Sequence, residues 1–365
     1  MTRPSQKTII IAGGGAIGAT CALVLARKGH AVTLMDPAPL GHNTSGMAAG
    51  MLAPAFEAVM DGSSRAVFEL YLESMRRWAP LLAELGLAQS KAPPSGAVWL
   101  GEDTPAMAAR FDALGADYRL ITAKAAQALS PGLCAFKADA LLAPQDGRLD
   151  PLATLAGLQA AGTRQGVHYH QGRLVQYGEG RGVLADGQVM KADYLVLASG
   201  LPRTLASLAP ELAHLSPIKG QLVHFDGLGL SAGPTLRTSL GYATPTARGL
   251  AVGATMEAGL DNTDLDAQVA ERLTALGRNL FPDLATVSPT ARAGVRAASP
   301  DGLPLVGPSK VAGVILACGM RRNGWLLAPL VAAQVAAYVQ SEDTSPWAAL
   351  LNAQRFDCAQ GEGDF

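Results

Sequence analysis

The N-terminal part of the chain places a β-branched apolar strand, a glycine-rich loop and an alanine-rich helix in immediate succession. The strand is Thr8–Ala12 and the loop is Gly13–Gly18. A glycine loop in this context is the kind that binds the pyrophosphate of a dinucleotide. In such a loop Gly13 permits the tight turn, Gly15 lets the backbone approach the pyrophosphate, and Gly18 lets helix and strand pack closely. The feature therefore predicts a dinucleotide-binding α/β domain.

The residues after the loop favour FAD or NAD over NADP. The helix N-terminus, from Ala16 and Ile17 onward, presents free N–H groups and a partial positive charge to phosphates. A second predicted strand, Ala31–Met35, ends in Asp36, whose carboxylate is placed to bind the ribose hydroxyls. An acid at this position repels a 2′-phosphate, so NADP is disfavoured. The loop alone does not separate FAD from NAD, and a glycine turn that binds nothing is the alternative.

The composition describes a globular protein large enough for two domains. The chain has 365 residues, of which 49% are hydrophobic and 16% charged, as is typical of a protein with a substantial core. Its formal net charge is −1, so nucleic acid and anionic lipid are not expected partners. The sequence leaves the oligomeric state open, a homo-oligomer included.

Neither a targeting segment nor a transmembrane segment is expected. The apolar stretch Ile9–Ala12 is too short for a secretory signal and lacks a cleavage site. The longest late apolar stretch, Trp325–Val339, contains Pro329 and is shorter than the ~20 residues that cross a bilayer. The four cysteines form no CxxC pair, which suits a reducing compartment. We therefore expect a cytoplasmic protein in which Cys21 and Cys318 are small core residues.

Strand and helix patterns alternate along the chain without repeats or a long linker. A buried strand, Tyr194–Gly200, is expected to end in small residues that include Ser199 and Gly200, which let a backbone approach a flat ligand. The stretch Ser216–Gly259 is rich in strands, and the helix after it has Asp264 as its expected N-cap.

These patterns predict an α/β fold made of two domains, each built from separate pieces of the chain. A Rossmann-like dinucleotide-binding domain is expected from residues 1–80, 145–215 and 290–365. An inserted, β-rich substrate domain of antiparallel sheet and helices is expected from residues 81–144 and 216–289.

Three further segments carry most of the chemical information. Thr44–Pro54 is made of small residues that would let the chain run past a flavin ring. Arg292–Gly307 carries Arg296, and Gly319–Pro329 carries Arg322 directly before the start of the last long helix. Each arginine is a candidate for binding an anionic group.

Together these segments resemble the D-amino-acid-oxidase-like flavoprotein family, and most closely its glycine oxidase branch, which is associated with thiamine biosynthesis. The resemblance runs from Thr8 to about Pro329, with its motifs in the family's order. Besides the N-terminal loop the matching segments are Ser45–Pro54, Gly147–Pro151, Pro217–Gln221, Tyr242–Pro245, Gly253–Glu257, Gly294–Gly307 and Gly319–Pro329. It implies a Rossmann-like FAD-binding domain with an inserted substrate domain.

The resemblance also implies which residues bind FAD. They are expected in the N-terminal loop, before Pro54, after the strand at Leu197 and at the start of the last helix. The expected residues are Gly13, Gly15, Ala16, Ile17, Gly18, Asp36, Thr44, Ser45, Ala49, Gly50, Met51, Ser199, Gly200, Arg322, Asn323, Gly324, Trp325 and Leu326. Relatives that attach flavin covalently use a cysteine near Gly294–Arg296, where this chain has none, so non-covalent FAD is expected.

An amino-acid oxidase moves a hydride from the substrate α-carbon to flavin N5, so the protein must hold the carboxylate and leave the amine neutral. The family match implies that Arg296 binds the carboxylate through its planar guanidinium. Tyr242 is expected to donate a second hydrogen bond, and Arg322 to contact substrate or the flavin edge. Met51, Met256 and Met320 are expected to line the pocket.

Each of these roles has a structural alternative. Arg296 could instead pair with a nearby acid such as Asp301, and Tyr242 could be a core tyrosine. Arg322 could be a surface arginine, and Met256 could simply pack at a strand end.

The sequence departs from the family pattern close to the expected substrate. Asp36 stands where the family has Glu, and Ala297 stands where it has Pro. Met320 and Arg321 replace the usual His and its neighbour. The resemblance therefore predicts fold and cofactor more firmly than it predicts the substrate.

The leading hypothesis is an FAD-dependent oxidase of glycine, small D-amino acids or N-methylated glycine that yields an imine and hydrogen peroxide. An alternative is a dehydrogenase of the same fold that passes electrons to a quinone or another carrier instead of oxygen. A non-catalytic flavin-binding module and an NAD-dependent dehydrogenase are further alternatives. His168 and His170 have no further ligand cluster, so a metal site is not expected.

Overall fold

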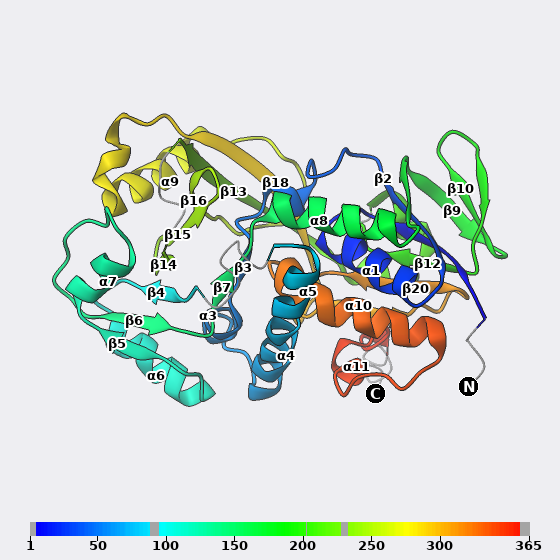
Figure 1. The fold of residues 1–365 in the computed structure, drawn as a ribbon, viewed down its shortest axis with the longest axis horizontal. Helices are drawn as coiled ribbons and strands as arrows, with labels where there is room; N and C mark the ends of the chain where they lie inside the picture. The colour runs from blue at the N-terminus through cyan, green and yellow to red at the C-terminus, as the bar shows by residue number, and fades with distance from the viewer. Residues whose placement is uncertain (1–4, 88–94, 202, 228–232, 358–365) are drawn as a thin grey trace, which may run out of the picture. The chain divides into compact units, whose positions relative to one another are not determined.

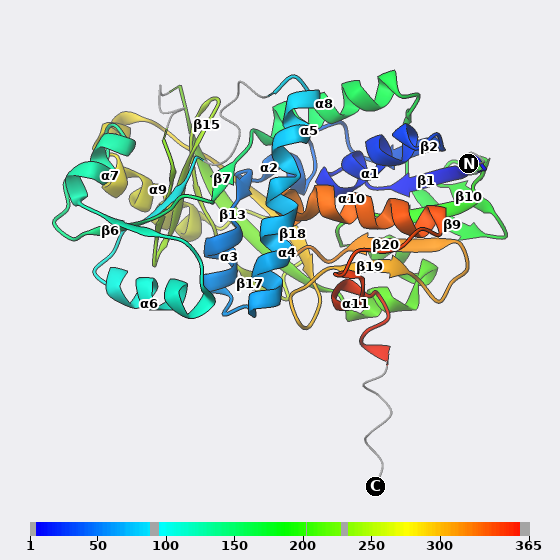
Figure 2. The same ribbon diagram turned by 60° about the horizontal axis from the view of Figure 1, so that its bottom comes forward.

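The computed structural model describes residues 5–87, 95–201, 203–227 and 233–357, and its fold is drawn in Figures 1 and 2. The chain divides into two compact units. Unit 1 comprises residues 1–46, 152–218 and 296–365, and unit 2 comprises residues 47–151 and 219–295. Residues 47–80, which the sequence analysis places with the cofactor domain, thus belong to unit 2. Cys358 lies outside the described residues.

Unit 1 is built on a six-stranded sheet of order β19-β20-β12-β1-β2-β8. The strands are β1 (Thr8–Ala12), β2 (Ala31–Asp36), β8 (His168–Gln171), β12 (Tyr194–Leu197), β19 (Leu305–Pro308) and β20 (Val314–Cys318). All neighbours run parallel except β19, which is antiparallel to β20. Because β1 lies centrally and is buried on both faces, its isoleucine run suits its place. This is the predicted Rossmann-like arrangement.

Helices cover this sheet. The helices of unit 1 are α1 (Ala16–Arg27), α2 (Thr44–Met47), α8 (Pro151–Arg164), α10 (Gly324–Gln340) and α11 (Ala348–Leu351), with 3₁₀ helices η1 (Arg203–Leu208) and η2 (Pro210–His214). Helices α1 and α10 lie side by side in both views (Figures 1 and 2). A core that includes Ile10, Leu195, Leu197 and Leu316 fills the sheet's interior side. A small antiparallel sheet of β9 (Leu174–Gly178), β10 (Arg181–Leu184) and β11 (Val189–Lys191) completes the unit.

Unit 2 contains a large mixed sheet of order β17-β13-β16-β15-β14-β4-β6-β5, with β18 beside β13. Its strands are β4 (Ala97–Trp99), β5 (Arg119–Ile121), β6 (Ala140–Ala143), β13 (Ser216–Asp226), β14 (Thr235–Thr238), β15 (Gly241–Thr246), β16 (Gly249–Gly253), β17 (Glu257–Ala258) and β18 (Thr290–Ala298). Strands β13, β16, β15 and β14 pair in antiparallel succession, as do β4, β6 and β5, in agreement with the predicted antiparallel sheet, whereas β14 and β4 pair in parallel. A separate pair joins β3 (Met51–Leu52) and β7 (Gly147–Arg148).

The helices of unit 2 pack on this framework. They are α3 (Pro54–Met60), α4 (Arg65–Arg76), α5 (Trp78–Glu84), α6 (Thr104–Leu114), α7 (Ala123–Leu129), α9 (Ala267–Leu280) and the 3₁₀ helix η3 (Pro282–Thr286). Helix α9 lies on β15 and β16, where Val269, Leu273 and Leu276 enter the core with Phe225. No helix in the described ranges is long and apolar enough to cross a membrane.

The structure corrects the predicted cap of α9. Asp266, not Asp264, is the N-cap residue, and its Oδ1 accepts hydrogen bonds from the amides of Gln268 (2.8 Å) and Val269 (3.3 Å). Two aspartates two residues apart both suit a cap by type. A tertiary contact distinguishes the two aspartates: the Asp266 amide donates a hydrogen bond to Gln221 Oε1 at 2.8 Å, which holds Asp266 at the start of the helix.

Candidate functional site

The glycine loop between β1 and α1 has a geometry that only glycine satisfies at two of its positions. Gly13 has φ +111°, and a Cβ atom there would collide with the carbonyl oxygen of Ala198. A Cβ on Gly18 would collide with the carbonyl oxygen of Gly13. The roles predicted for Gly13 in the turn and for Gly18 in close packing are therefore confirmed.

Asp36, at the end of β2, lies against the glycine loop. Its Oδ2 accepts a hydrogen bond from the Gly14 amide at 2.7 Å, and its Oδ1 accepts one from the Ala38 amide at 2.8 Å. A carboxylate has about four lone-pair positions, so two remain for the hydroxyls of a ribose. The carboxylate thus combines a structural role with acceptor capacity for a ligand.

Ser45 joins the first helix to the last. Its Oγ accepts a hydrogen bond from the Ala16 amide at 3.0 Å, and its carbonyl oxygen accepts one from Trp325 Nε1, also at 3.0 Å. A Cβ on Gly15 would come 2.8 Å from the same Oγ. The structure thus brings together three segments that lie far apart in the sequence, at Gly15 and Ala16, at Ser45 and at Trp325, whereas Thr44, at the start of α2, is exposed.

Two helices of unit 1 begin at residues expected to bind FAD. Neither α1 nor α10 has an acidic residue in its first turn, and neither Gly15 nor Asn323 caps its helix with a side-chain hydrogen bond. The positive end of each helix dipole is therefore not neutralised by its own first turn. Ile17 is buried in the first turn of α1, and Gly324 to Leu326 form the first turn of α10.

The end of β12 supplies a further polar group. Ser199 follows this strand next to Gly13, and its Oγ is buried without a hydrogen-bond partner among the described residues. Buried hydroxyls nearly always have a partner, so this group has capacity for a ligand. Gly200 is exposed with φ +70°. Together with Asp36, the loop and the helix ends, these residues fit a dinucleotide.

Arg296 lies on β18 beside the turn that leads into α10. The Arg321 amide donates a hydrogen bond to the Ala297 carbonyl oxygen at 2.8 Å, and Ala298 forms a β-bridge with Met320. Arg296, Met320 and Arg322 are all half-buried, and Arg321 takes a left-handed conformation with φ +51°. The Arg296 strand and the Arg322–Asn323 start of α10 are thus neighbours in unit 1.

Asp301, the acid that could have paired with Arg296, forms an ion pair with Arg355. Both Asp301 carboxylate oxygens accept hydrogen bonds from Arg355, at 2.7 and 2.8 Å. Arg355 therefore already supplies the bidentate ion pair of this acid.

In unit 2, Tyr242 lies opposite Arg237 and Gly253 on neighbouring strands. Its ring covers Gly253, since a Cβ there would come 2.8 Å from the Tyr242 Oη. Met256 follows β16 and is 40% exposed, so it is not a core methionine. Ala49 and Gly50 are buried, and the Gly50 carbonyl oxygen accepts a hydrogen bond from the Leu149 amide at 2.9 Å.

The sequence analysis missed a buried ion pair beside Met51. Arg237 Nη2 donates to Glu57 Oε1 at 2.7 Å, and the two side chains are each 6% exposed. The sulfur atoms of Met51 and Met60 lie 3.5 Å from the guanidinium, and Phe56 stacks 5.2 Å from it. No periodicity marks the pair, because its members are 180 positions apart. The only local signal is a charge within each of two apolar elements.

Asp146 belongs to the same charged cluster. Its oxygens accept hydrogen bonds from the amides of Ala55 (2.8 Å) and Phe56 (3.2 Å) at the start of α3. Burial raises the pKa of Asp146 to about 7, against the opposing effects of Arg237 and these two amides, and Glu57 adds to the rise. Unit 2 therefore holds a buried ion pair and a second buried acid, which interacts electrostatically with both of its members, beside a residue expected to line the pocket.

Comparison with known proteins supports the predicted family. A family model described as "DAO: FAD dependent oxidoreductase" matches residues 8–338. The glycine oxidase of Pseudomonas putida is 30% identical, over 89% of this chain and 92% of that protein. The bifunctional protein ThiO/ThiG of Synechocystis sp. is 31% identical over 96% of this chain. This chain spans only about half of that protein's length, 54%.

The fold agrees as well. The crystal structure of glycine oxidase from Geobacillus kaustophilus superimposes with a TM-score of 0.82 at 26% identity, covering 96% of this chain and 99% of that one. The glycine loop, Asp36 and the two helix ends, whose first turns carry no acid, fit the cofactor named in the family's description. The chain belongs to the DAO family of FAD-dependent oxidoreductases.

Proposed function

We propose that the protein oxidises the C–N bond of glycine, sarcosine or a small D-amino acid, with oxygen as the electron acceptor. The observation that carries the proposal is the contact of the Arg296 strand with the Met320–Arg321 turn. This contact lies next to Arg296 in the chain and joins its strand to the turn that leads into α10, in the unit that holds the dinucleotide loop. An anionic substrate and the cofactor would then meet at one edge of unit 1.

Each residue of the proposed site has a distinct role in binding the substrate or in stabilising charge. Bound FAD supplies the chemistry by accepting two electrons from the substrate. Arg296 binds the substrate carboxylate with two parallel N–H···O bonds. Tyr242 donates its hydroxyl hydrogen to the same carboxylate, and Met51 and Met320 limit the space for a side chain. The N-terminus of α10 stabilises negative charge that develops nearby, and the amine binds in its neutral form, so no side chain has to remove a proton.

Other finer features are part of the same proposal. Non-covalent binding of FAD follows from the absence of a cysteine in Gly294–Arg296. Similarity to glycine oxidases and to ThiO/ThiG supports glycine as substrate and a place in thiamine biosynthesis. Unit 1 would be the cofactor domain and unit 2 the substrate domain.

An anaerobic screen tests the substrate class. The holoprotein is mixed with glycine, sarcosine, D-alanine, D-proline or a larger D-amino acid, and loss of flavin absorbance is followed. Bleaching by the small substrates, with fast recovery on mixing with oxygen, is the expected result. No bleaching by any of them would refute the proposal, and slow recovery would replace oxygen by another electron carrier.

Arg296→Ala tests the carboxylate site. Charge-assisted hydrogen bonds contribute about 1.5–3 kcal/mol, so KM for the best substrate should rise about 10- to 100-fold, with a smaller fall in kcat. Arg292→Ala is the matched control, because Arg292 is half-buried on the same strand four positions earlier. Equal effects of the two substitutions would exclude Arg296 as the carboxylate ligand.

A further inference from the structure

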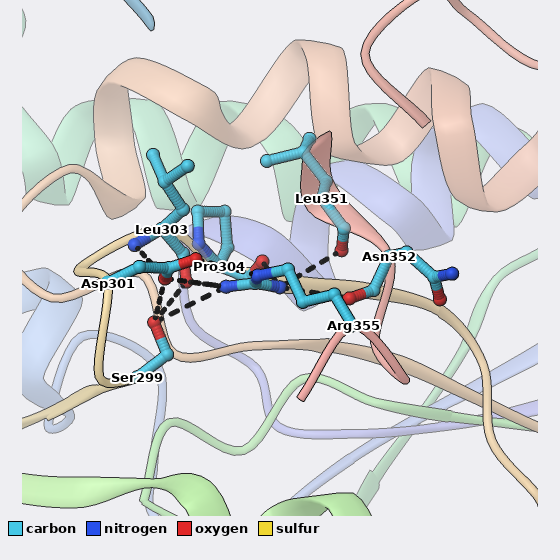
Figure 3. A network of polar contacts seen from close by, with 7 residues as sticks. All are labelled: Ser299, Asp301, Leu303, Pro304, Leu351, Asn352 and Arg355. Carbon is cyan, nitrogen blue, oxygen red and sulfur yellow. Dashed lines mark hydrogen bonds and ion pairs between the residues drawn. The ribbon is translucent and has the colours of Figure 1, made fainter. Parts of the chain in front are cut away.

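The C-terminal segment of unit 1 is bound to the loop that follows the Arg296 strand. Residues 299–304 connect β18 to β19, and residues 352–357 follow α11. Figure 3 shows the Arg355 side chain lying between the two segments, directed at Asp301 and Ser299. We refer to residues 299–304 as the DG loop. It lies three residues after Arg296.

Every nitrogen of the Arg355 guanidinium donates to an acceptor. Nε and Nη2 bind the two oxygens of Asp301, and Nη2 also donates to the Leu303 carbonyl oxygen at 2.8 Å. Nη1 donates to the carbonyl oxygens of Pro304 and Asn352, each at 3.0 Å. Four of these five acceptor atoms lie in the DG loop and one in the C-terminal segment. Lysine could not reproduce this arrangement, because its donors share one nitrogen.

The DG loop is also closed internally by the acid that Arg355 binds. Asp301 Oδ1 accepts hydrogen bonds from Ser299 Oγ at 2.8 Å and from the Leu303 amide at 3.0 Å. Burial opposes ionisation of this carboxyl, yet the hydrogen bonds from Arg355, Leu303 and Ser299 hold its pKa below the usual value. The carboxylate is therefore charged in the neutral pH range, and it joins the two ends of the loop through these hydrogen bonds.

On its other side the loop contacts the turn that leads into α10. Gly302 faces the Arg321 side chain, since a Cβ atom added to Gly302 would lie 3.8 Å from Arg321 Cδ and 3.9 Å from its Nη1. The Arg321 amide is bound by Ala297, next to Arg296. Arg355, the DG loop, the Arg321 turn and the Arg296 strand thus form one continuous set of contacts.

We propose that Arg355 is a positioning residue for the substrate carboxylate site. By fixing the DG loop, it fixes the register of β18 against the Met320–Arg321 turn and so the direction of the Arg296 guanidinium. The proposal rests on the proposed function for the identity of the ligand, because it takes Arg296 to be the carboxylate-binding group. Misplacement of such a group by about 1 Å can cost two orders of magnitude.

Arg355→Met is the principal test, and Lys310→Met is its matched control. Lys310 pairs with Asp357 of the same C-terminal segment at 3.1 Å but does not bind the DG loop. We expect Arg355→Met to raise KM for glycine-type substrates, and the Kd of acetate measured from the flavin spectrum, by about tenfold or more. Its kcat and FAD content should stay within about twofold of wild type, and Arg355→Lys should fall between the two. Lys310→Met should change neither constant.

Lower thermal stability of Arg355→Met with unchanged KM and acetate Kd would overturn the proposal, since the residue would then be structural only. Should Arg355→Met fail to fold, Asp301→Asn takes its place, because it keeps the bonds from Arg355 to the carbonyl oxygens. A several-fold rise in acetate Kd in Asp301→Asn supports the proposal, and wild-type affinity overturns it.

Amide hydrogen exchange separates this proposal from the proposed function. The amides of Leu303 and Arg321 should exchange faster in Arg355→Met than in wild type, and at wild-type rates in Lys310→Met. That result would support the positioning role even if no amino acid bleached the flavin. Unchanged exchange at both amides would overturn it even in an active oxidase.

Discussion

At the residue scale, Arg237 places a full positive charge where almost no water reaches it. Glu57 balances that charge at 2.7 Å, and Asp146 adds a second acid whose pKa burial raises to about 7. Taking one member from a buried pair leaves the other charge uncompensated. The free energy cost of burying each of the three side chains therefore depends on the charges of the other two.

This dependence predicts an unequal cost for breaking the pair. Arg237→Met should lower the free energy of unfolding by about 3–5 kcal/mol, because it leaves Glu57 buried without its cation. Glu57→Gln should cost less, since Asp146 can compensate Arg237 by ionising. The double variant Glu57→Leu/Arg237→Met should recover most of the loss, as replacement by apolar groups is often nearly neutral.

Urea unfolding of the three holoproteins measures these differences. The exposed pair of Arg248 and Asp226 provides a control, because exposed ion pairs contribute about 0–1 kcal/mol. A double variant less stable than Arg237→Met would contradict the account.

At the element scale, Asp266 shows how one cap directs a helix. It binds two amides of α9, whose apolar face then meets Phe225 in the core of unit 2. Asp266→Ala should destabilise the protein by about 1 kcal/mol. Asp264→Ala, two positions earlier at an exposed site, should stay within about 0.5 kcal/mol of wild type. Chemical unfolding of both variants distinguishes them, and a larger loss in Asp264→Ala would restore the cap expected from sequence.

The helices and strands that could be predicted from the sequence are those formed by interactions between residues close together in the chain. The strand–loop–helix at residues 8–27 and the strand ending at Asp36 were predicted because hydrophobic run, glycine spacing and cap chemistry all act within a few residues. The helical stretch from Arg65 to Glu84 is divided at Arg77 into α4 and α5. Pro80 lacks the amide hydrogen that would continue the first helix. The spacing of apolar residues alone does not predict this break.

The features that could not be predicted from the sequence are contacts between residues far apart in the chain. Family motifs pointed to Arg296, Tyr242 and the FAD loop, because such motifs keep their residue types. Arg237 with Glu57 and Arg355 with Asp301 are pairs made by tertiary packing, and neither member carries a periodic signal. The parallel pairing of β4 with β14 likewise depends on segments more than a hundred residues apart.

At the scale of the whole molecule, the binding of FAD and the folding of the chain are coupled equilibria. A ligand that binds only the folded state adds about 2.7 kcal/mol at a hundredfold excess over its Kd. The melting temperature of the protein should therefore rise with FAD concentration. Asp36→Ala should shrink that rise, because it removes the acceptor for the ribose.

Asp193→Ala is the control for Asp36→Ala. Its Oδ2 accepts the Thr8 amide at 2.7 Å, so both aspartates bind a backbone amide of unit 1. Both apoproteins should melt lower than wild type, whereas only Asp36→Ala should lose the response to FAD. Full FAD response in Asp36→Ala, measured by thermal scanning, would exclude its ribose role.

The sheet order of unit 1 has a consequence for the making of the protein on the ribosome. Strand β12 lies between β1 and β20, so β1, which is synthesised first, lacks its neighbour β12 until about 180 further residues have been made, and β12 then lacks β20 for more than a hundred residues. Until α10 and Arg355 have emerged, the nascent chain has a glycine loop without the helix that Ser45 joins to it. Because such non-local pairings close slowly, capture of FAD becomes a late event, and an incomplete chain exposes an unpaired apolar strand to chaperones and proteases.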